Sequence, residues 1–286
     1  MRIAIVGLGL IGGSLALKLT EEGYSVWGIS RNPVTCQRAL ERGAVQGCGT
    51  ELAQLTLFNP QVVVICTPLE HVLTTLEALV PHLSPQTVVS DVGSVKQPIV
   101  GPATALWPLF VGGHPMAGKT LQGIQAAEAN LFLGRPYVLT PIPQTQPQAL
   151  TVMQELVAAV GAKVVLADPV RHDQAVAWIS HLPVMVGAGL IAAVSQEEDQ
   201  EVLALARTLA SSGFRDTSRV GGGVPQLGLE MARYNRQALL AALGSYQAEL
   251  ETMKQLIEDE QWEELLQRLQ RIRQEWQQFP VNQAAP

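Results

Sequence analysis

The feature that most constrains the fold of this chain is a glycine-rich turn near its start. Residues 3–6 (I-A-I-V) form a continuous apolar run, which is typical of a strand that is buried on both faces of a parallel sheet. Gly7, Gly9 and Gly12 follow as G-x-G-x-x-G, and an apolar helix is predicted over residues 14–19. Such glycines allow a tight turn, close approach of the backbone to a pyrophosphate, and close packing of helix on strand. The strand–turn–helix context predicts a dinucleotide site in an α/β domain with a Rossmann-type parallel sheet.

The diphosphate of a dinucleotide would lie on the free N–H groups at the start of this helix, where the helix dipole is positive. We therefore expect the cofactor to contact Gly7, Gly9, Leu10, Ile11 and Gly12. The alternative is a turn that serves only the structure of the chain.

The length and charge of the chain limit its architecture and its partners. At 286 residues it exceeds the usual size of a single core, so two domains are expected. A hydrophobic content of 47% is that of an ordinary globular protein. The net charge of −6 argues against nucleic acid and anionic membranes as main partners.

The cysteines and the apolar segments favour a cytoplasmic protein. Cys36, Cys48 and Cys66 form no C-x-x-C pair, so neither a metal site nor a disulfide is predicted, and a reducing compartment fits. The glycine turn interrupts the apolar start, so no signal peptide is expected. Residues 182–194 form the longest apolar run, which is too short to span a bilayer and predicts a buried helix.

The residues after the second predicted strand, residues 25–29, indicate which dinucleotide binds. An NAD enzyme usually has Asp or Glu at this point to bind the ribose 2′-hydroxyl. This chain has Ser30 followed by Arg31. No carboxylate would repel a 2′-phosphate, and a guanidinium could pair with it, so NADP is predicted. The alternative is that Arg31 is a solvated surface residue.

Further strands are predicted over residues 61–66, 87–90, 109–112, 137–140 and 163–167. Thr67 follows the first of these and is expected near the nicotinamide, because ligands of open α/β sheets lie beyond the carboxyl ends of the strands. The loops that begin at Asp91 and Gly113 are expected at the same sheet edge.

After Asp168 the strand signals end. Helices are predicted over residues 170–193, 197–211, 225–253 and 259–279. Pro183 predicts a kink just after His181. We assign residues 1–168 to the dinucleotide-binding domain, residues 169–279 to a helical domain, and residues 280–286 to a tail.

The last predicted helix has one apolar stripe, formed by Trp262, Leu265, Leu266, Leu269, Ile272, Trp276 and Phe279. The stripe fits packing within its own domain and a dimer interface equally well.

His114 is the candidate catalytic base. A histidine at a strand end beside a dinucleotide pocket is the usual group that removes a hydroxyl proton as hydride leaves. The glycines before His114 and Pro115 after it predict a non-helical loop. The alternative is a structural histidine, which is the commoner role of a histidine considered alone.

Several short motifs, in this order, resemble the prephenate/arogenate dehydrogenase family of tyrosine biosynthesis. They are residues 6–16 (V-G-L-G-L-I-G-G-S-L-A), 91–96 (D-V-G-S-V-K), 112–118 (G-G-H-P-M-A-G), 179–183 (I-S-H-L-P) and 214–219 (F-R-D-T-S-R), followed by Pro225 and Asn235. The resemblance covers nearly the whole chain. It implies a nucleotide-binding domain, then an all-helical domain through which a homodimer forms, and an active site between the two domains.

The resemblance also implies roles for individual residues. His114 would accept a hydrogen bond from the ring 4-hydroxyl, and Ser94 would help to orient it. Arg219 would bind a substrate carboxylate, and His181 would line the substrate pocket. From the residues alone, a solvated loop arginine remains the alternative for Arg219.

The reaction that the resemblance implies has a chemical logic of its own. Loss of hydride from the hydroxyl-bearing ring carbon, with His114 taking the hydroxyl proton, gives a ketone conjugated through the ring to the carbon that bears the carboxylate. This is a vinylogous β-keto acid, and loss of CO₂ makes the ring aromatic. No metal and no separate decarboxylating residue are therefore expected.

Three positions depart from the family pattern, and all bear on the side chain of the substrate. Many relatives have Thr-Glu where this chain has Lys119-Thr120, a second histidine where it has Val184, and an aromatic residue where it has Gly228. The choice between arogenate and prephenate is thus open from the pocket residues. We predict an NADP-dependent arogenate dehydrogenase, because this cofactor recurs with arogenate in one branch of the family.

A prephenate dehydrogenase that forms 4-hydroxyphenylpyruvate is the near alternative. A β-hydroxyacid dehydrogenase is more distant, since it would use a lysine on a long interdomain helix and residues 170–193 contain none. A non-catalytic NADP(H)-binding sensor is the third alternative.

Overall fold

A computed structural model of the protein describes residues 1–119 and 121–279, and the chain divides into two compact units. The first unit is Met1–Arg236, and the second begins at Gln237. The predicted tail, residues 280–286, and Thr120 lie outside the described residues. The domain boundary predicted after residue 168 stays a prediction.

The first unit contains one sheet of eight strands. They are β1 (Arg2–Val6), β2 (Ser25–Ile29), β3 (Gly47–Gly49), β4 (Val62–Ile65), β5 (Val88–Asp91), β6 (Phe110–Pro115), β7 (Pro136–Thr140) and β8 (Lys163–Leu166). The strand order is β3-β2-β1-β4-β5-β6-β7-β8, and every neighbouring pair is parallel except β6 and β7. The strand order reverses between β1 and β4, and in open α/β sheets ligands bind at such a switch point.

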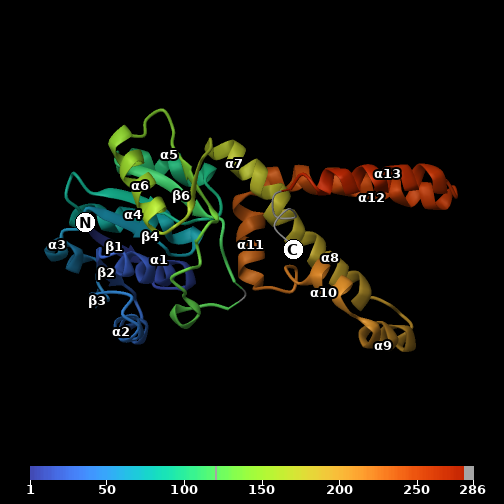
Figure 1. The fold of residues 1–286 in the computed structure, drawn as a ribbon, viewed down its shortest axis with the longest axis horizontal. Helices are drawn as coiled ribbons and strands as arrows, with labels where there is room; N and C mark the ends of the chain where they lie inside the picture. The colour runs from blue at the N-terminus through green and yellow to red at the C-terminus, as the bar shows by residue number, and fades with distance from the viewer. Residues whose placement is uncertain (120, 280–286) are drawn as a thin grey trace. The chain divides into compact units, whose positions relative to one another are not determined.

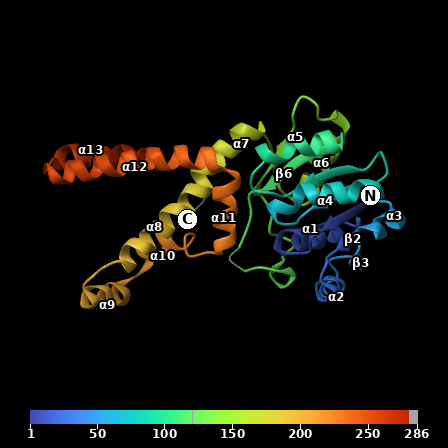
Figure 2. The same ribbon diagram turned by 180° about the vertical axis from the view of Figure 1, so that it is seen from behind.

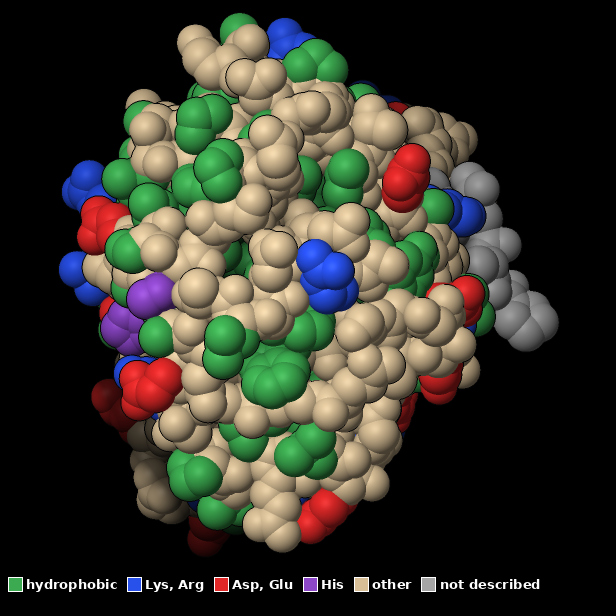
Figure 3. Space-filling model, turned by 90° about the vertical axis from the view of Figure 1, so that its left-hand side faces the viewer, with side chains coloured by type: hydrophobic (Ala, Val, Ile, Leu, Met, Phe, Trp, Pro, Cys, Tyr) green, Lys and Arg blue, Asp and Glu red, His purple; other side chains and the backbone are tan. Residues whose placement is uncertain are grey.

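Helices cover both faces of the sheet (Figures 1 and 2). They are α1 (Leu10–Glu21), α2 (Pro33–Glu41), α3 (Leu55–Phe58), α4 (Val72–Leu79), α5 (Gln97–Leu106) and α6 (Pro147–Ala159). Alternate residues of β1 point to opposite faces: Ile3 and Ile5 pack in one core with α1 and α6, whereas Ala4 packs in the other with α4 and α5. Burial on both faces explains why this strand is apolar throughout. On the face shown in Figure 3, acidic and basic side chains are interspersed among apolar ones.

Helices alone follow the last strand in the first unit. They are α7 (Pro169–Val176), α8 (Leu182–Ser195), α9 (Gln200–Leu209), α10 (Ser212–Ser218) and α11 (Pro225–Tyr234). The Asp168 side chain caps α7 by accepting hydrogen bonds from the N–H groups of Val170 and Arg171 at 2.9 and 3.0 Å. One π-helical turn, Ala177–His181, joins α7 to α8. This irregular turn ends at His181, just after which the sequence predicts a kink.

The second unit is a pair of helices. It holds nearly all of α12 (Arg236–Glu258) together with α13 (Trp262–Trp276), and the two lie side by side (Figure 1). An ion pair between Glu249 and Arg268 joins them. No residue of α13 is buried, and its predicted apolar stripe is exposed at Trp262, Leu266, Leu269 and Ile272.

The predicted fold class is confirmed: a mostly parallel Rossmann-type sheet is followed by an all-helical part. Two element predictions are wrong. His114 lies within β6 rather than in a loop, because β7 runs antiparallel to that strand and pairs His114 with Val138. The helix predicted over residues 225–253 is broken at Asn235, whose buried side chain bonds to other elements.

The prediction of a buried helix over residues 182–194 is also wrong, because only Leu182 and Gly187 of α8 are buried. The continuous helical stretch Pro169–Ser195 has 27 residues, and a window of it reaches a mean hydropathy of 1.7 with 28% of its residues buried. By length and composition alone, such a helix could cross a membrane. Most of its apolar side chains are therefore left for another surface to cover.

The prediction that no disulfide forms is wrong as well. Cys36 and Cys48 are bonded, with their Cα atoms 5.4 Å apart. The pair is 12 residues apart in sequence and matches no motif. It forms because β3, which contains Cys48, lies beside β2 and brings this cysteine to the first turn of α2.

Candidate functional site

The glycine turn, the end of β2 and the end of β4 meet at one edge of the sheet. Gly7 has a φ of +103°, and a Cβ atom there would lie 2.6 Å from the carbonyl oxygen of Cys66 and 3.1 Å from the nitrogen of Thr67. Its N–H donates a hydrogen bond of 2.9 Å to the carbonyl of Ile29, the residue before Ser30. The turn, Thr67 and Ser30 are thus brought together as the sequence predicts.

The predicted diphosphate contacts are the turn and first residues of α1, namely Gly7, Gly9, Leu10, Ile11 and Gly12. A Cβ atom on Gly12 would lie 2.0 Å from the carbonyl oxygen of Gly7, whereas one on Gly9 would meet nothing within 4 Å. The Oγ1 atom of Thr67 is buried and has no hydrogen-bond partner among the described residues. Open space over Gly9, free N–H groups at a helix start and an unpaired hydroxyl all fit a bound dinucleotide.

No carboxylate stands at the end of β2, where the adenosine ribose would lie. Ser30 is half-buried; its N–H donates to the carbonyl of Gly49 at 3.0 Å, and its Oγ accepts from the N–H of Asn32 at 3.4 Å. Arg31 is exposed, and no ion pair joins it to another described residue. Its guanidinium is available to an anionic ligand.

A chain of hydrogen bonds leads from His114 to a buried carboxylate. Nδ1 of His114 lies 2.8 Å from Nε2 of His172, and Nδ1 of His172 lies 2.7 Å from Oδ1 of Asp173. The same carboxylate accepts the N–H groups of Lys96 and Gln97, each at 2.8 Å. His172 and Asp173 are only 3% and 2% exposed, so water does not compete for these bonds.

Asn235 joins His181 to the same hydrogen-bond network, which is called the Asp173 hub below. Its Nδ2 donates to the main-chain carbonyl of Asp173 at 2.7 Å and lies 3.1 Å from Nδ1 of His181. His181 is fully buried, and its Nε2 has no partner among the described residues. Burial lowers the pKa of His181 to about 4; Asp173 opposes this shift and His172 adds to it. The His181 ring is therefore neutral near pH 7.

A second buried ion pair holds the strand beside His114. The Lys96 ammonium pairs with the Asp91 carboxylate and donates to the carbonyl of Gly113 at 2.8 Å. Asp91 also accepts the N–H of Gly113 at 3.1 Å. Burial lowers the pKa of Lys96, while Asp91 acts in the opposite direction. The pair fixes the backbone of Gly113, the residue before His114.

The surroundings of His114 favour its neutral form. Burial lowers its pKa well below the ordinary value, and the neighbouring His172, Lys96 and His181 act in the same direction. A neutral imidazole with one free nitrogen can accept a proton from a hydroxyl group.

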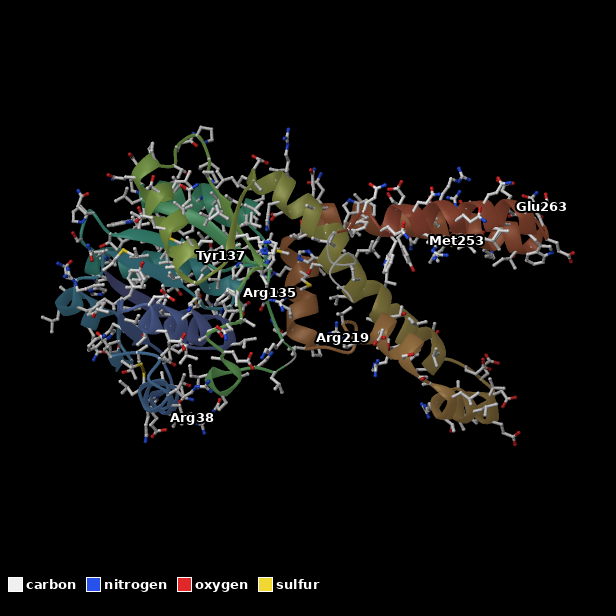
Figure 4. All side chains as sticks on the ribbon, in the orientation of Figure 1. Arg38, Arg135, Tyr137, Arg219, Met253 and Glu263 are labelled. Carbon is white, nitrogen blue, oxygen red and sulfur yellow. A yellow bond between two sulfur atoms is a disulfide. The ribbon has the colours of Figure 1, made fainter. Side chains whose placement is uncertain are left out.

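Two predicted site residues are not joined to this network. No hydrogen bond connects the Ser94 hydroxyl to His114 within the described part of the chain. Arg219 is exposed and follows α10 on the loop seen in Figure 4. Its neighbour Arg215 pairs with Asp216 at 2.9 Å. The substrate roles of Ser94, Arg219 and His181 stay predictions.

Three residues of this network had no role predicted from the sequence: His172, Asp173 and Asn235. An adjacent His-Asp pair in the first helix after the last strand is the signal that could have indicated the first two. For Asn235 the signal was its place in a family motif, but no chemistry had been assigned to it.

An apolar cavity of about 330 Å³ lies between α8, the loop after α10 and α11. Val184 and Gly228, two of the positions that depart from the family pattern, both line it. Met185, Val220 and Val224 also contribute to its wall. The third departure, at Thr120, is outside the described residues.

Comparisons with known proteins match most of the chain. Residues 15–166 match the family described as prephenate dehydrogenase, nucleotide-binding domain, and residues 168–271 match prephenate dehydrogenase, dimerization domain. The prephenate dehydrogenase of Bacillus subtilis is 32% identical over 92% of this chain and 72% of its own length.

Two solved structures are similar over nearly the full chain. The arogenate dehydrogenase of Synechocystis is 50% identical, with a TM-score of 0.87 over 97% of this chain and 99% of that one. The prephenate dehydrogenase of A. aeolicus, in complex with hydroxyphenyl propionate and NAD⁺, is 28% identical, with a TM-score of 0.91 over 97% of each chain.

The glycine turn offers a matched pair of substitutions. Gly12→Ala should lower Tm by several degrees, because its Cβ would clash with the backbone of Gly7 and a cost of 1 kcal/mol corresponds to about 2–4 °C at this size. Gly9→Ala should leave Tm unchanged but raise the Kd for a nicotinamide dinucleotide about tenfold or more, since its Cβ would enter the space proposed for the diphosphate.

Thermal unfolding and fluorescence titration with the reduced cofactor would measure both effects. Wild-type affinity in Gly9→Ala would contradict a diphosphate at this turn. An unchanged Tm in Gly12→Ala would contradict the packing described.

Proposed function

The chain belongs to the prephenate/arogenate dehydrogenase family, and from this premise we propose that it is an NADP-dependent arogenate dehydrogenase. It would oxidise and decarboxylate L-arogenate to L-tyrosine. The observation that carries the cofactor preference is the pair Ser30-Arg31 at the end of β2, where no carboxylate stands. The 50% identity to an arogenate dehydrogenase supports the substrate. Prephenate, which would give 4-hydroxyphenylpyruvate, is the alternative substrate.

In this proposal the cofactor lies across the carboxyl edge of the sheet. The N–H groups at the start of α1 would bind the diphosphate, and Arg31 would pair with the 2′-phosphate of the ribose. The unpaired hydroxyl of Thr67 would face the nicotinamide half. When bound, the nicotinamide accepts the hydride that leaves the hydroxyl-bearing ring carbon of the substrate.

His114 would take the hydroxyl proton as the hydride departs. Its lowered pKa keeps it unprotonated near pH 7, so it is ready to accept a proton before the reaction begins. The Asp91–Lys96 pair fixes the backbone beside it, which limits its movement relative to the substrate. Ser94, on the loop after β5, would help to hold the same hydroxyl.

The decarboxylation then needs little from the protein. The ketone formed by the oxidation is conjugated with the carbon that bears the carboxylate, and the aromatic ring formed by loss of CO₂ drives the step. The task of the site is to hold the substrate: Arg219 would bind a carboxylate through its planar fork, and His181 would line the pocket.

The active form would be a cytoplasmic homodimer built through the helical part. The match to a dimerization domain supports this assembly. The exposed apolar surface of α8 fits the same interpretation, because a second copy of the chain would cover it. Leu266 and Ile272 on α13 are exposed apolar residues that such an interface could also use.

Initial rates with two substrates and two cofactors test the proposal. We expect kcat/KM to be highest for arogenate with NADP⁺, because Ser30 and Arg31 suit the 2′-phosphate and the identity to an arogenate dehydrogenase favours arogenate. A higher value with prephenate would overturn the substrate while leaving the family in place. Equal turnover of NAD⁺ would overturn the cofactor.

A single substitution should reverse the cofactor preference. In Ser30→Asp the new carboxylate would repel the 2′-phosphate of NADP⁺ and accept a hydrogen bond from the 2′-hydroxyl of NAD⁺. The ratio of kcat/KM values for the two cofactors should therefore invert. Ser30→Ala is the matched control, since it removes the hydroxyl without adding charge, and it should still prefer NADP⁺.

The base should stay active at unusually low pH. Because the pKa of His114 lies well below 6.5, kcat should remain level as the pH falls through 6.5, and it should decline only when the pH approaches the lowered pKa. His114→Ala should lower kcat by about 10²–10⁴-fold and leave the Kd for the cofactor unchanged. Near-normal kcat in this variant would remove His114 from the mechanism.

Arg219→Ala should raise KM for the substrate about tenfold or more, because loss of one partner of a charge pair costs on the order of 2 kcal/mol. Lysine should restore only part of the affinity, since it keeps the charge and loses the fork. Arg215→Ala is the matched control, as that arginine lies one helical turn earlier, in α10, and pairs with Asp216. A rise in KM for NADP⁺ alone would assign Arg219 to the cofactor.

A further inference from the structure

We infer that His172 is a positioning residue that fixes His114 in the tautomer with its proton on Nδ1 and a free lone pair on Nε2. The inference rests on the proposed role of His114 as the base, and it adds the reason why one particular nitrogen of that ring can act. The sequence motifs do not assign this role to His172.

The carboxylate of Asp173 fixes the direction of its hydrogen bond with His172. Oδ1 of Asp173 already accepts the N–H of Lys96, and Oδ2 accepts the N–H of Gln97. Both oxygens thus act as acceptors, as those of a carboxylate do. The 2.7 Å contact from Oδ1 to the ring of His172 must then have its proton on Nδ1 of His172.

The protonation of His172 in turn fixes the direction of the hydrogen bond between the two imidazole rings. A neutral His172 with its proton on Nδ1 has a lone pair on Nε2. His114 must then donate from its own Nδ1 across the 2.8 Å contact. Its remaining nitrogen, Nε2, carries a lone pair and makes no hydrogen bond with a described residue. That nitrogen is the one that can receive the substrate proton.

A hydrogen bond donated in the opposite direction, from His172 to His114, would prevent His114 from accepting the substrate proton. If His172 were an imidazolium, its Nε2 would donate to His114, and the proton of a neutral His114 would stand on Nε2, where it blocks proton transfer. The groups that face the two rings are Asp173, Lys96, His181 and, beyond Lys96, Asp91. The Lys96 ammonium, itself fully buried, disfavours a second buried cation at this place.

Asn235 fixes the tautomer of His181, and this tautomer is the opposite of the one inferred for His114. Its Nδ2 donates to a carbonyl of Asp173, which fixes the orientation of the amide, and its second N–H points to Nδ1 of His181. A neutral His181 therefore carries its proton on Nε2, the buried nitrogen that has no partner. The Asp173 hub thus leaves Nε2 of His114 as a hydrogen-bond acceptor and Nε2 of His181 as a donor.

Two substitutions separate the hydrogen bond from the volume of the side chain. Gln at position 172 can place an acceptor near the position of Nε2, whereas Leu cannot. We expect His172→Leu to lower kcat by about 10–10³-fold, since a catalytic histidine in the wrong tautomer can lose up to about 10⁴-fold. His172→Gln should stay within about tenfold of the wild type. Both should keep the wild-type Kd for NADPH.

Nitrogen-15 NMR of protein labelled at histidine reads the tautomer directly, without turnover. The ring resonances of His114 are assigned from their loss in His114→Ala. We expect a protonated Nδ1 and an unprotonated Nε2 in the wild type and in His172→Gln, and a mixture of both tautomers in His172→Leu. His82→Leu, a control substitution outside the site, should leave the His114 resonances and kcat unchanged.

A proton on Nε2 of wild-type His114 would overturn the inference, even in an enzyme that turns over arogenate. Unchanged His114 resonances in His172→Leu would overturn it as well. If the protein turns over neither arogenate nor prephenate, the proposed function fails, and the NMR result still decides the tautomer. If His172→Leu does not fold, the wild type and His172→Gln provide the same spectroscopic test.

Discussion

The site depends on one buried carboxylate, that of Asp173. This side chain belongs to α7, in the helical part of the first unit, and it binds the first N–H groups of α5, which packs on the sheet. Burying a charge is costly unless donors replace the lost water. Here two main-chain N–H groups and the ring of His172 do so, and the positive end of the α5 dipole adds to them. Without this carboxylate, the hydrogen bonds from α5 that fix the position of His172 on α7 relative to His114 on the sheet would be lost.

Charged side chains lie near the reacting nitrogen of His114, but the His114 ring itself is uncharged. Lys96 and Asp91 neutralise each other inside the protein and act on the backbone of Gly113, while Asp173 acts through a ring. His114 itself remains neutral because it is buried, with the Lys96 ammonium close by. A single histidine in a loop would have none of these constraints. The chemistry proposed for the site therefore depends on a strand, two helices and Asn235 together.

Local sequence patterns predicted the parts of the fold that are set by burial. Residues 25–29 form a strand with the predicted bounds, and residues 3–6 do so within one residue, because strands buried on both faces are apolar throughout. The glycine turn, Ser30 and Thr67 also meet at one edge, since parallel strands end together. What the sequence could not predict depends on distant partners: β7 extends β6 as far as His114, and β3 brings Cys48 to Cys36.

The hub around Asp173 was missed for the same reason. His172 and Asp173 are neighbours in sequence, but the groups that they bind are about 60 to 80 residues away along the chain. Asn235 belonged to a recognised motif and still had no role, because its two partners become visible only when α7 and the π-helical turn are placed beside it. A motif can thus identify a residue without indicating what it does.

The two neutral histidines also make the fold sensitive to acid. His181 has a pKa of about 4 in the folded chain and an ordinary value near 6.5 when unfolded, so between these values the unfolded chain takes up a proton that the folded chain does not. Stability is therefore lost as the pH falls from 6.5 towards 4. At about 1.4 kcal/mol per pKa unit, this one residue accounts for roughly 3 kcal/mol, and His114 adds to the loss with the same sign. The burial that keeps the base ready for proton transfer thus sets a lower limit to the pH at which the protein stays folded.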